Sequence, residues 1–157
     1  MTGSAHVKRA SKPEDLVTEI FDELTPKGIT VELVRPEQEA RWNKLIRKHH
    51  YLKEHRLVGE SLRYVIKQRG RWIGLLGWSS AAFHLRPRDA WIGWTDAQRH
   101  GGRHLLACNS RFALFTRQGR SPNLASHCLH LNLQRLSADW QARYCGGRAK
   151  SGAKVAV

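Results

Sequence analysis

Two short polar segments of the sequence carry side chains that could do chemistry. The first is His49-His50-Tyr51, which Glu60 follows nine residues later. Histidine can act as an acid or a base near neutral pH, and Glu60 could orient it. Neighbouring side chains on a helix point about 100° apart, so at most one of the two histidines belongs to a given site. His49 falls on the apolar stripe of a predicted helix and is expected to pack in the core, which leaves His50 as the candidate.

The second segment is Asn109-Ser110-Arg111, which interrupts an otherwise apolar segment that is predicted to be a strand. Polar side chains inside a sheet cost stability unless they are hydrogen-bonded, and this favours a functional site. A strand bulge or the end of a sheet would explain the triplet equally well. Both interpretations stay open from the sequence.

Charge is the strongest compositional signal, because 27 Lys and Arg face only 13 Asp and Glu, a formal net charge of +14. Such an excess implies a polyanionic partner, which we expect to be nucleic acid, DNA in preference to RNA. No acid occurs from Ala97 to Ala138, and arginine suits bidentate phosphate contacts. We therefore expect one cationic surface, the alternative being that its arginines are merely solvated. Its members would be Arg99, Arg103, Arg111, Arg117 and Arg120.

The segment from Ala107 to Leu136 has the order strand, basic loop, helix and is a candidate phosphate site. Ser121 can cap a helix that Pro122 begins, and a helix N-terminus favours anions. Acyl-CoA transferases of the GNAT type hold pyrophosphate at such a turn with Gln/Arg-x-x-Gly-x-Gly/Ala. Here the residue three after Arg117 is Arg120 rather than glycine, and a capped helix with two exposed arginines is the plainer alternative.

The remaining chemistry-bearing residues indicate neither a metal nor a cofactor. Cys108, Cys128 and Cys145 are an odd number without CxxC spacing, which predicts reduced thiols and no zinc or disulfide framework. No apolar run approaches the roughly 18 residues of a membrane helix, and the N-terminus has no apolar signal core. We therefore expect a cytoplasmic protein without a membrane partner.

The elements that must position these residues are a helix from Ser11 to Leu24, an edge strand over 29–34 and a second helix from Pro36. They are followed by a long β-hairpin, whose return strand from Arg71 to Trp78 is apolar on both faces and should be an inner strand. Residues 83–103 are expected to be connecting structure. Further elements are a strand within 104–115 and a helix to Leu136 with a wide apolar face.

This order predicts an α/β (α+β) fold, in which helices flank a mixed, mainly antiparallel sheet. The organisation that we expect is a flexible basic arm over residues 1–10, one domain over 11–144 and a disordered tail over 145–157. The tail is rich in Gly, Ala and Lys and has no large apolar residue before its end.

Seven sequence blocks, which span about residues 37–144, occur in a fixed order. They are Trp42-Asn43-x-Leu45-Ile46-Arg47-x-x-His50-Tyr51-Leu52, Leu57-Val58-Gly59-Glu60-x-Leu62-Arg63-Tyr64, Leu76-Gly77-Trp78-Ser79-Ser80-Ala81-Ala82, Pro87-Arg88-Asp89-x-Trp91-Ile92-Gly93-Trp94, Asn109-Ser110-Arg111-Phe112, Pro122-Asn123-Leu124-Ala125-Ser126 and Asp139-Trp140-Gln141-Ala142-Arg143-Tyr144. Together they resemble the DruA family of the Druantia anti-phage system. The resemblance implies a GNAT-like fold, a place in bacterial phage-defence loci, and relatives joined to transposase-type sequences.

The resemblance places six residues at motif positions, and these form the candidate catalytic set: His50, Tyr51, Glu60, Asn109, Ser110 and Arg111. It implies no particular reaction, so whether the protein is an enzyme stays open. Relatives continue past the position of Tyr144 with a further strand and an acidic, aromatic block. Here a Gly/Ala/Lys segment stands instead, so we expect a truncated chain with a sheet that is incomplete at the C-terminus.

These observations together predict a DruA-like defence component that contacts nucleic acid and has other defence-system proteins as possible partners. The alternatives are a GNAT-like acyltransferase, a transposon-associated accessory protein and an inactive truncated remnant.

Overall fold

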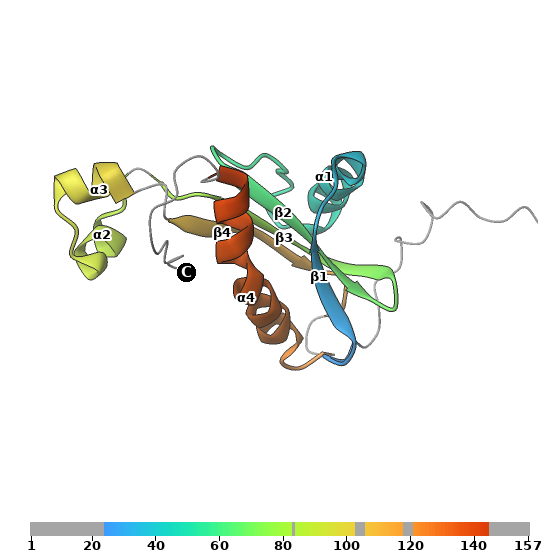
Figure 1. Cartoon of the computed structure of the whole chain (residues 1–157). Coiled ribbons are helices and arrows are strands. Elements are labelled where there is room, and N and C mark those ends of the chain that lie inside the picture. Colours follow the sequence, from blue (N-terminus) through green and yellow to red (C-terminus); the bar gives the residue numbers. More distant parts are fainter. Residues whose placement is uncertain (1–23, 83, 103–105, 118–120, 145–157) are drawn as a thin grey trace, which may run out of the picture.

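A four-stranded antiparallel sheet forms the centre of the computed structural model, which describes residues 24–82, 84–102, 106–117 and 121–144 (Figure 1). The strands follow one another across the sheet in chain order. They are β1 (Ile29–Leu33), β2 (Ser61–Gln68), β3 (Arg71–Ser80) and β4 (Ala107–Leu114). The prediction of a mixed α/β fold around a mainly antiparallel sheet is confirmed.

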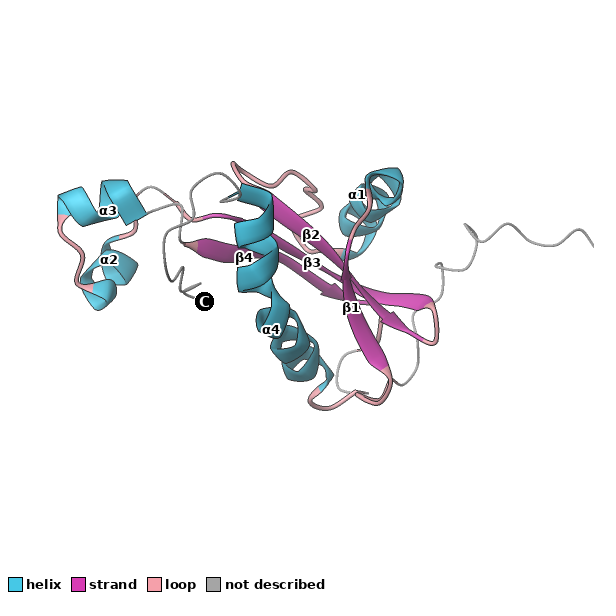
Figure 2. Cartoon of the chain, in the orientation of Figure 1, coloured by secondary structure: helices cyan, strands magenta, loops and turns pink. Residues whose placement is uncertain are grey.

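One long helix covers each face of the sheet (Figure 2). The helix α1 (Glu39–His49), which continues the short 3-10 helix η2 (Pro36–Gln38), buries Trp42, Leu45 and Ile46 against one face. The helix α4 (Leu124–Tyr144) buries a stripe of residues against the other. This stripe recurs every four residues and consists of Leu124, Cys128, Asn132, Leu136 and Trp140.

The alternation in β2 divides its side chains between the two helices, as the sequence predicts. Leu62, Tyr64 and Ile66 pack in the core beneath α4, whereas Val65 packs in the core beneath α1. From Trp72 to Ser79 every residue of β3 is buried, because both of its neighbours are strands and both of its faces are covered. The prediction of an inner return strand is therefore confirmed.

The hairpin between β2 and β3 turns through two residues with positive φ, Arg69 at 50° and Gly70 at 76°. Two consecutive left-handed residues match the right-handed twist of the strands that they join. The side-chain nitrogen of Gln68 donates to the carbonyls of Thr25 at 2.8 Å and Lys27 at 2.7 Å. This ties the hairpin tip to the segment that leads into β1.

The connection between β3 and β4 contains two short helices, α2 (Arg86–Ile92) and α3 (Asp96–Gly102), where the sequence predicted only connecting structure. They lie beyond one end of the sheet (Figure 1). Buried Asp89 of α2 joins the two helices, since its carboxylate lies 3.5 Å from Nε of Arg99 in α3, and it also accepts from Arg88 at 2.6 Å within α2. Helices of seven residues have little stability of their own, so these depend on such contacts.

The helix α4 begins at Leu124, three residues later than Ser121, and it ends eight residues later than the predicted end at Leu136. The wide apolar face predicted for this helix is only partly buried, because Ala125 and Leu133 are exposed, and the buried stripe also contains the polar residue Asn132. The predicted N-terminal helix lies outside the described residues except for Leu24, which is buried. The predicted arm over 1–10 and tail over 145–157 also lie outside the described residues.

Candidate functional site

His50 is the C-cap residue that follows α1 and is the more buried of the two adjacent histidines, with 6% of its surface exposed. His49 is half-buried, and its ring centroid lies 4.8 Å from that of Phe115. The prediction that His49 packs in the core and leaves His50 as the less buried residue was therefore wrong. Nδ1 of His50 accepts a hydrogen bond from the backbone of Leu52 at 3.3 Å. Burial, and then the charge of Arg111, lower the pKa of His50. The imidazole is therefore neutral near pH 7.

Arg111 fastens the loop after His50 to the sheet. Its guanidinium donates to the carbonyls of Glu54 at 2.6 Å and Arg56 at 2.9 Å, as well as to the carbonyl of Ser110 at 2.7 Å. A rigid fork with several N–H donors suits this task. The guanidinium is consequently occupied by backbone carbonyls and does not offer the free fork that phosphate binding was predicted to use.

Ser110 is the extra residue of a β-bulge. Gly77 pairs with Arg111 and Trp78 pairs with Asn109, so Ser110 has no partner of its own on β3. Its hydroxyl lies within hydrogen-bond distance of the hydroxyl of buried Ser79 and donates to the carbonyl of Cys108 at 3.3 Å. The polar triplet therefore marks a bulge, one of the two interpretations that the sequence left open.

The candidate catalytic residues do not form one acid–base relay. Tyr51 is 82% exposed and its ring contacts the ring of His50 at 4.5 Å. The backbone carbonyl of Glu60 accepts from the backbone of Ser80 at 2.8 Å. No hydrogen bond joins the Glu60 carboxylate to His50 in the described part of the chain, so the predicted orienting role has no geometric support. At this end of the molecule, Arg111 fixes the loop after α1, and Tyr51 exposes its aromatic ring.

The described arginines of the acid-free segment do not form the single cationic surface that the sequence predicts. Arg99 contacts Asp89 and Asp96, and its guanidinium also lies 2.7 Å from Nδ1 of His84. Arg117 follows the far end of β4, whereas Arg99 lies in α3, next to the beginning of that strand. Two members of the predicted surface, Arg103 and Arg120, lie outside the described residues.

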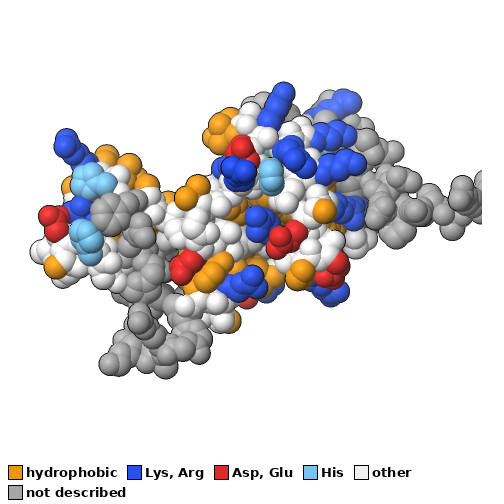
Figure 3. All heavy atoms as spheres, turned by 90° about the horizontal axis from the view of Figure 1, so that it is seen from above, with side chains coloured by type: hydrophobic (Ala, Val, Ile, Leu, Met, Phe, Trp, Pro, Cys, Tyr) orange, Lys and Arg blue, Asp and Glu red, His pale blue; other side chains and the backbone are white. Residues whose placement is uncertain are grey.

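Exposed cations gather instead over α1. Figure 3 shows lysine and arginine side chains crowded on this side of the molecule. The spacing of Trp42, Leu45 and Ile46 turns the opposite side of the helix to solvent. We call the exposed cations of this helix and of the loop after it the α1 basic face; they are Lys44, Arg47, Lys48, Lys53 and Arg56.

Of the predicted phosphate turn before α4, residues 118–120 lie outside the described residues, and Ser121 is used for packing. The hydroxyl of Ser121 accepts from the backbone of Leu24 at 2.9 Å and lies 3.0 Å from the hydroxyl of Thr116. Because α4 begins only at Leu124, Ser121 does not cap it as predicted. The geometry around Ser121 thus gives no support to the acyltransferase alternative.

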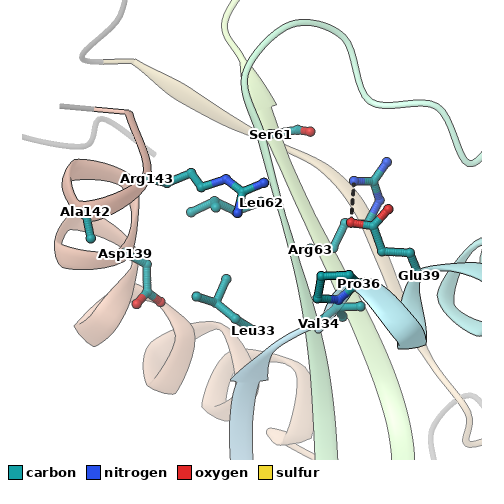
Figure 4. Close-up of a pocket in the computed structure, with 10 residues that line it drawn as sticks. All are labelled: Leu33, Val34, Pro36, Glu39, Ser61, Leu62, Arg63, Asp139, Ala142 and Arg143. Atoms are coloured by element: carbon teal, nitrogen blue, oxygen red, sulfur yellow. Dashed lines mark ion pairs between the residues drawn. The ribbon is translucent and has the colours of Figure 1, made fainter. Parts of the chain in front are cut away.

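A pocket of about 270 Å³ opens at the edge of the sheet, where β1 ends and β2 continues (Figure 4). Arg63 and Glu39 stand on one side and Arg143 reaches in from the end of α4. We call it the sheet-edge pocket. Its lining residues are Leu33, Val34, Pro36, Glu39, Ser61, Leu62, Arg63, Asp139, Ala142 and Arg143.

The floor of this pocket is braced by a polar network from α4. Asp139 accepts from Arg135 at 2.6 Å and from the hydroxyl of Tyr64 at 2.9 Å. Burial, together with this carboxylate, raises the pKa of Tyr64, so its hydroxyl stays a donor. Arg135 also donates to the carbonyl of Val31 at 2.7 Å, which links α4 to the edge strand.

Among the described residues, no group of three or more His, Cys, Asp or Glu side chains could hold a metal ion. Cys108 and Cys128 are free thiols, and burial raises the pKa of Cys128 to about 11. Cys145 lies outside the described residues. None of the described helices is long and apolar enough to cross a membrane.

No curated protein matches the chain. No solved structure matches it either, so the GNAT-like fold stays a prediction. A family model described as Druantia protein DruA matches residues 3–150, which is most of the sequence. The chain therefore belongs to the DruA family of Druantia proteins.

Proposed function

We propose that this DruA-family chain, as a component of Druantia anti-phage defence, contacts nucleic acid through the α1 basic face. The observation that carries the proposal is the set of cations that one helix side turns to solvent. Lys44, Arg47 and Lys48 are exposed, and no carboxylate of the described residues pairs with them. Cations that are free of protein partners can replace the counterions of a phosphate backbone.

The loop after α1 extends this face. Lys53 and Arg56 are exposed in the loop, and the bonds from Arg111 to the carbonyls of Glu54 and Arg56 hold its backbone in place. Because the loop is already ordered, less conformational entropy would be lost when it meets a ligand. The α1 basic face thus consists of the exposed side of the helix and the braced loop that follows it in the chain.

Tyr51 lies within the same segment and adds a second kind of contact. Its ring is 82% exposed and rests on the neutral imidazole of His50. A supported, exposed aromatic ring beside cations suits stacking with an unpaired base, for which alanine substitution costs about 1–3 kcal/mol per base. We infer that the preferred ligand is DNA with unpaired bases, with RNA of the same sequence as the comparison.

The test is a binding titration of fluorescent oligonucleotides by the full chain between about 50 and 200 mM salt. For wild type we expect log Kobs to fall steeply with log salt. Substitution of Lys44, Arg47 and Lys48 by glutamine should lower the slope by about two to three units, because each phosphate contact contributes about 0.7–0.9. Tyr51→Ala should weaken binding to single strands more than binding to duplex.

A control variant with three exposed cations replaced elsewhere tests whether binding depends on the α1 basic face or only on the net charge of the protein. The control cations are exposed as well: Lys27 precedes β1, Arg69 is at the hairpin tip and Arg86 begins α2. Their replacement by glutamine removes the same charge. We expect this variant to bind nearly as wild type does. Equal weakening by both triple variants, or a flat salt dependence of wild type, would show that the α1 basic face is not a nucleic-acid surface. Specific binding by a cooperatively folded chain would also argue against an inactive remnant.

A further inference from the structure

The sheet-edge pocket forms where β2 extends beyond the end of its shorter neighbour β1. The register of β1 with β2 ends at Leu33, opposite Tyr64, and one further bond runs from the backbone N–H of Val34 to the carbonyl of Arg63 at 2.9 Å. β2 extends beyond this point to Ser61. The hydroxyl of Tyr144 accepts from the backbone N–H of Ser61 at 2.8 Å and donates to its carbonyl at 2.6 Å. Because this stretch of strand edge is already satisfied, the space beside it suits a small ligand rather than an added strand.

Arg63 lines the pocket and carries an unsatisfied donor. Its Nε is buried and has no hydrogen-bond partner among the described residues. One terminal nitrogen of Arg63 lies 3.9 Å from a carboxylate oxygen of Glu39, which is a loose contact, and the guanidinium lies 5.4 Å from the ring of Trp42. A buried guanidinium N–H without a partner is costly unless a ligand or water satisfies it.

Arg143 supplies a second guanidinium from the opposite wall. In Figure 4 its side chain extends from the end of α4 into the pocket and over Leu62. Arg143 is exposed, and none of the carboxylates in the described ranges pairs with it. The two cations therefore come from different layers, one from β2 and one from α4.

The two carboxylates of the pocket, Asp139 and Glu39, differ in how far they can neutralise these arginines. Both oxygens of Asp139 accept from Arg135, at 2.6 and 3.3 Å, and one also accepts from Tyr64. Glu39 has 46% of its side chain exposed and can turn to solvent. The free hydrogen-bonding capacity of the pocket consists mainly of donors, which suits an anionic ligand.

We propose that the sheet-edge pocket binds a phosphomonoester on a compact organic body. A phosphomonoester offers three acceptor oxygens and a charge of about −1.5 to −2, enough for guanidinium groups on two walls. A carboxylate has only two oxygens, and a single arginine fork satisfies both. Leu33, Val34, Pro36 and Leu62 provide apolar contacts for the body of the ligand.

The size of the pocket limits the ligand. Sites for drug-sized molecules have roughly 300–1,000 Å³, and this pocket has about 270 Å³. It can hold one nucleotide, either a free mononucleotide or the phosphorylated end of a strand. Binding of a strand end would deepen the proposed function and rests on it, whereas binding of a free mononucleotide does not.

The experiment uses the full chain and isothermal titration with deoxyadenosine monophosphate, deoxyadenosine and inorganic phosphate. We expect the monophosphate to bind more tightly than inorganic phosphate and deoxyadenosine not to bind measurably. Arg143→Gln should weaken monophosphate binding about 10- to 100-fold, the usual effect of losing charge-assisted hydrogen bonds. Arg86→Gln, which removes an exposed charge from α2, should leave binding unchanged.

Glu39→Gln tests whether the ligand is anionic or cationic without disturbing the core. Removing this carboxylate frees Arg63, so a phosphomonoester should bind several-fold more tightly. A ligand with a cationic group would lose a partner and bind more weakly. Weaker monophosphate binding by Glu39→Gln, no binding to wild type at millimolar ligand, or unchanged affinity in Arg143→Gln would each overturn the proposal.

Oligonucleotides with and without a 5′-phosphate, and with and without a 3′-phosphate, separate the two sources. A phosphate-dependent gain that Arg143→Gln abolishes identifies a strand end as the ligand, and binding of the monophosphate without such a gain identifies the free nucleotide. The α1 triple variant should still bind the monophosphate, and Arg143→Gln should keep the salt slope of unphosphorylated strands. These results distinguish a failure of the ligand-binding proposal for the pocket from a failure of the proposed nucleic-acid contact at the α1 basic face.

Discussion

The indole N–H of Trp78 donates to the side-chain oxygen of Asn132 at 2.5 Å, and both residues are fully buried. This bond joins the central strand β3 to the middle of α4. This buried bond favours one register of helix against sheet, because a shift would leave the indole N–H and the amide oxygen without partners. The same helix supplies Asp139 and Arg143 to the sheet-edge pocket, so the pocket depends on this register.

A double-mutant cycle should reveal coupling between Trp78 and Asn132. We expect Trp78→Phe and Asn132→Leu each to lower the free energy of unfolding by about 1–3 kcal/mol, because each leaves a buried polar partner unsatisfied. The double variant should lose less than the sum, with a coupling of about 0.5–3 kcal/mol in urea denaturation. The exposed pair His130 and Gln134, 3.1 Å apart, serves as the control and should couple by less than about 0.5 kcal/mol. Additive losses at Trp78 and Asn132 would contradict the prediction.

Gly74 allows the close approach of β4 to β3. A Cβ at this position would lie 2.7 Å from Cδ2 of Leu114 and 2.8 Å from the carbonyl oxygen of Ala113. Gly74→Ala should therefore lower the free energy of unfolding by about 1–3 kcal/mol through overpacking. Gly101→Ala in α3 meets no atom within 4 Å and should be neutral or up to about 1 kcal/mol stabilising. Urea midpoints of the two variants compare them directly, and equal midpoints would refute the packing argument.

Stability should fall as the pH is lowered from about 7.5 to about 5.5, in part because His50 must then bind a proton. Burial and then Arg111 lower its folded-state pKa from the ordinary 6.5, so the unfolded chain binds the proton first. The contribution is present above about pH 6.5 and is lost below it as the pH approaches the folded pKa. Asp89, whose pKa is also lowered, loses its contribution only nearer pH 4.

The urea midpoint should consequently drop less in His50→Gln than in wild type over this pH range. Some of the drop should remain, since burial also lowers the pKa of His49. His130→Gln, on the exposed side of α4, should drop as wild type does. An identical drop in wild type and His50→Gln would exclude His50 as a source of the pH dependence.

Arg111→Gln should release the loop that carries Lys53 and Arg56. The substitution removes the bonds to the carbonyls of Glu54 and Arg56 while the sheet remains paired. We expect trypsin to cut after Lys53 or Arg56 about tenfold faster, the factor that corresponds to roughly 1.4 kcal/mol of local stability. Mass spectrometry of the first fragments identifies the cut, and Arg86→Gln is the control. Unchanged cleavage would mean that the clamp does not order the loop.

The two-faced sheet could be predicted because its signal is local. Period-two alternation in β2 and the doubly apolar run of β3 each fix the side-chain directions of neighbouring residues. The helix α1 could be predicted in the same way, from the helical spacing of Trp42, Leu45 and Ile46. By contrast, α2 and α3 are too short to show a period, and their stability comes from the contact of Asp89 with Arg99.

The amino-acid sequence alone determined the sheet, its two covering helices, the cationic excess and the DruA motifs, because each is a pattern among neighbouring residues or a count. Only the tertiary structure decided which cations stay free. Arg111 is 57 residues from Glu54, whose carbonyl it binds, and Arg99 meets Asp89 across two helices. Partners so far apart in the chain are chosen by the folded geometry. Arg99 and Arg111 of the predicted surface are therefore used in internal contacts, while Lys44, Arg47 and Lys48 of α1 remain exposed to solvent.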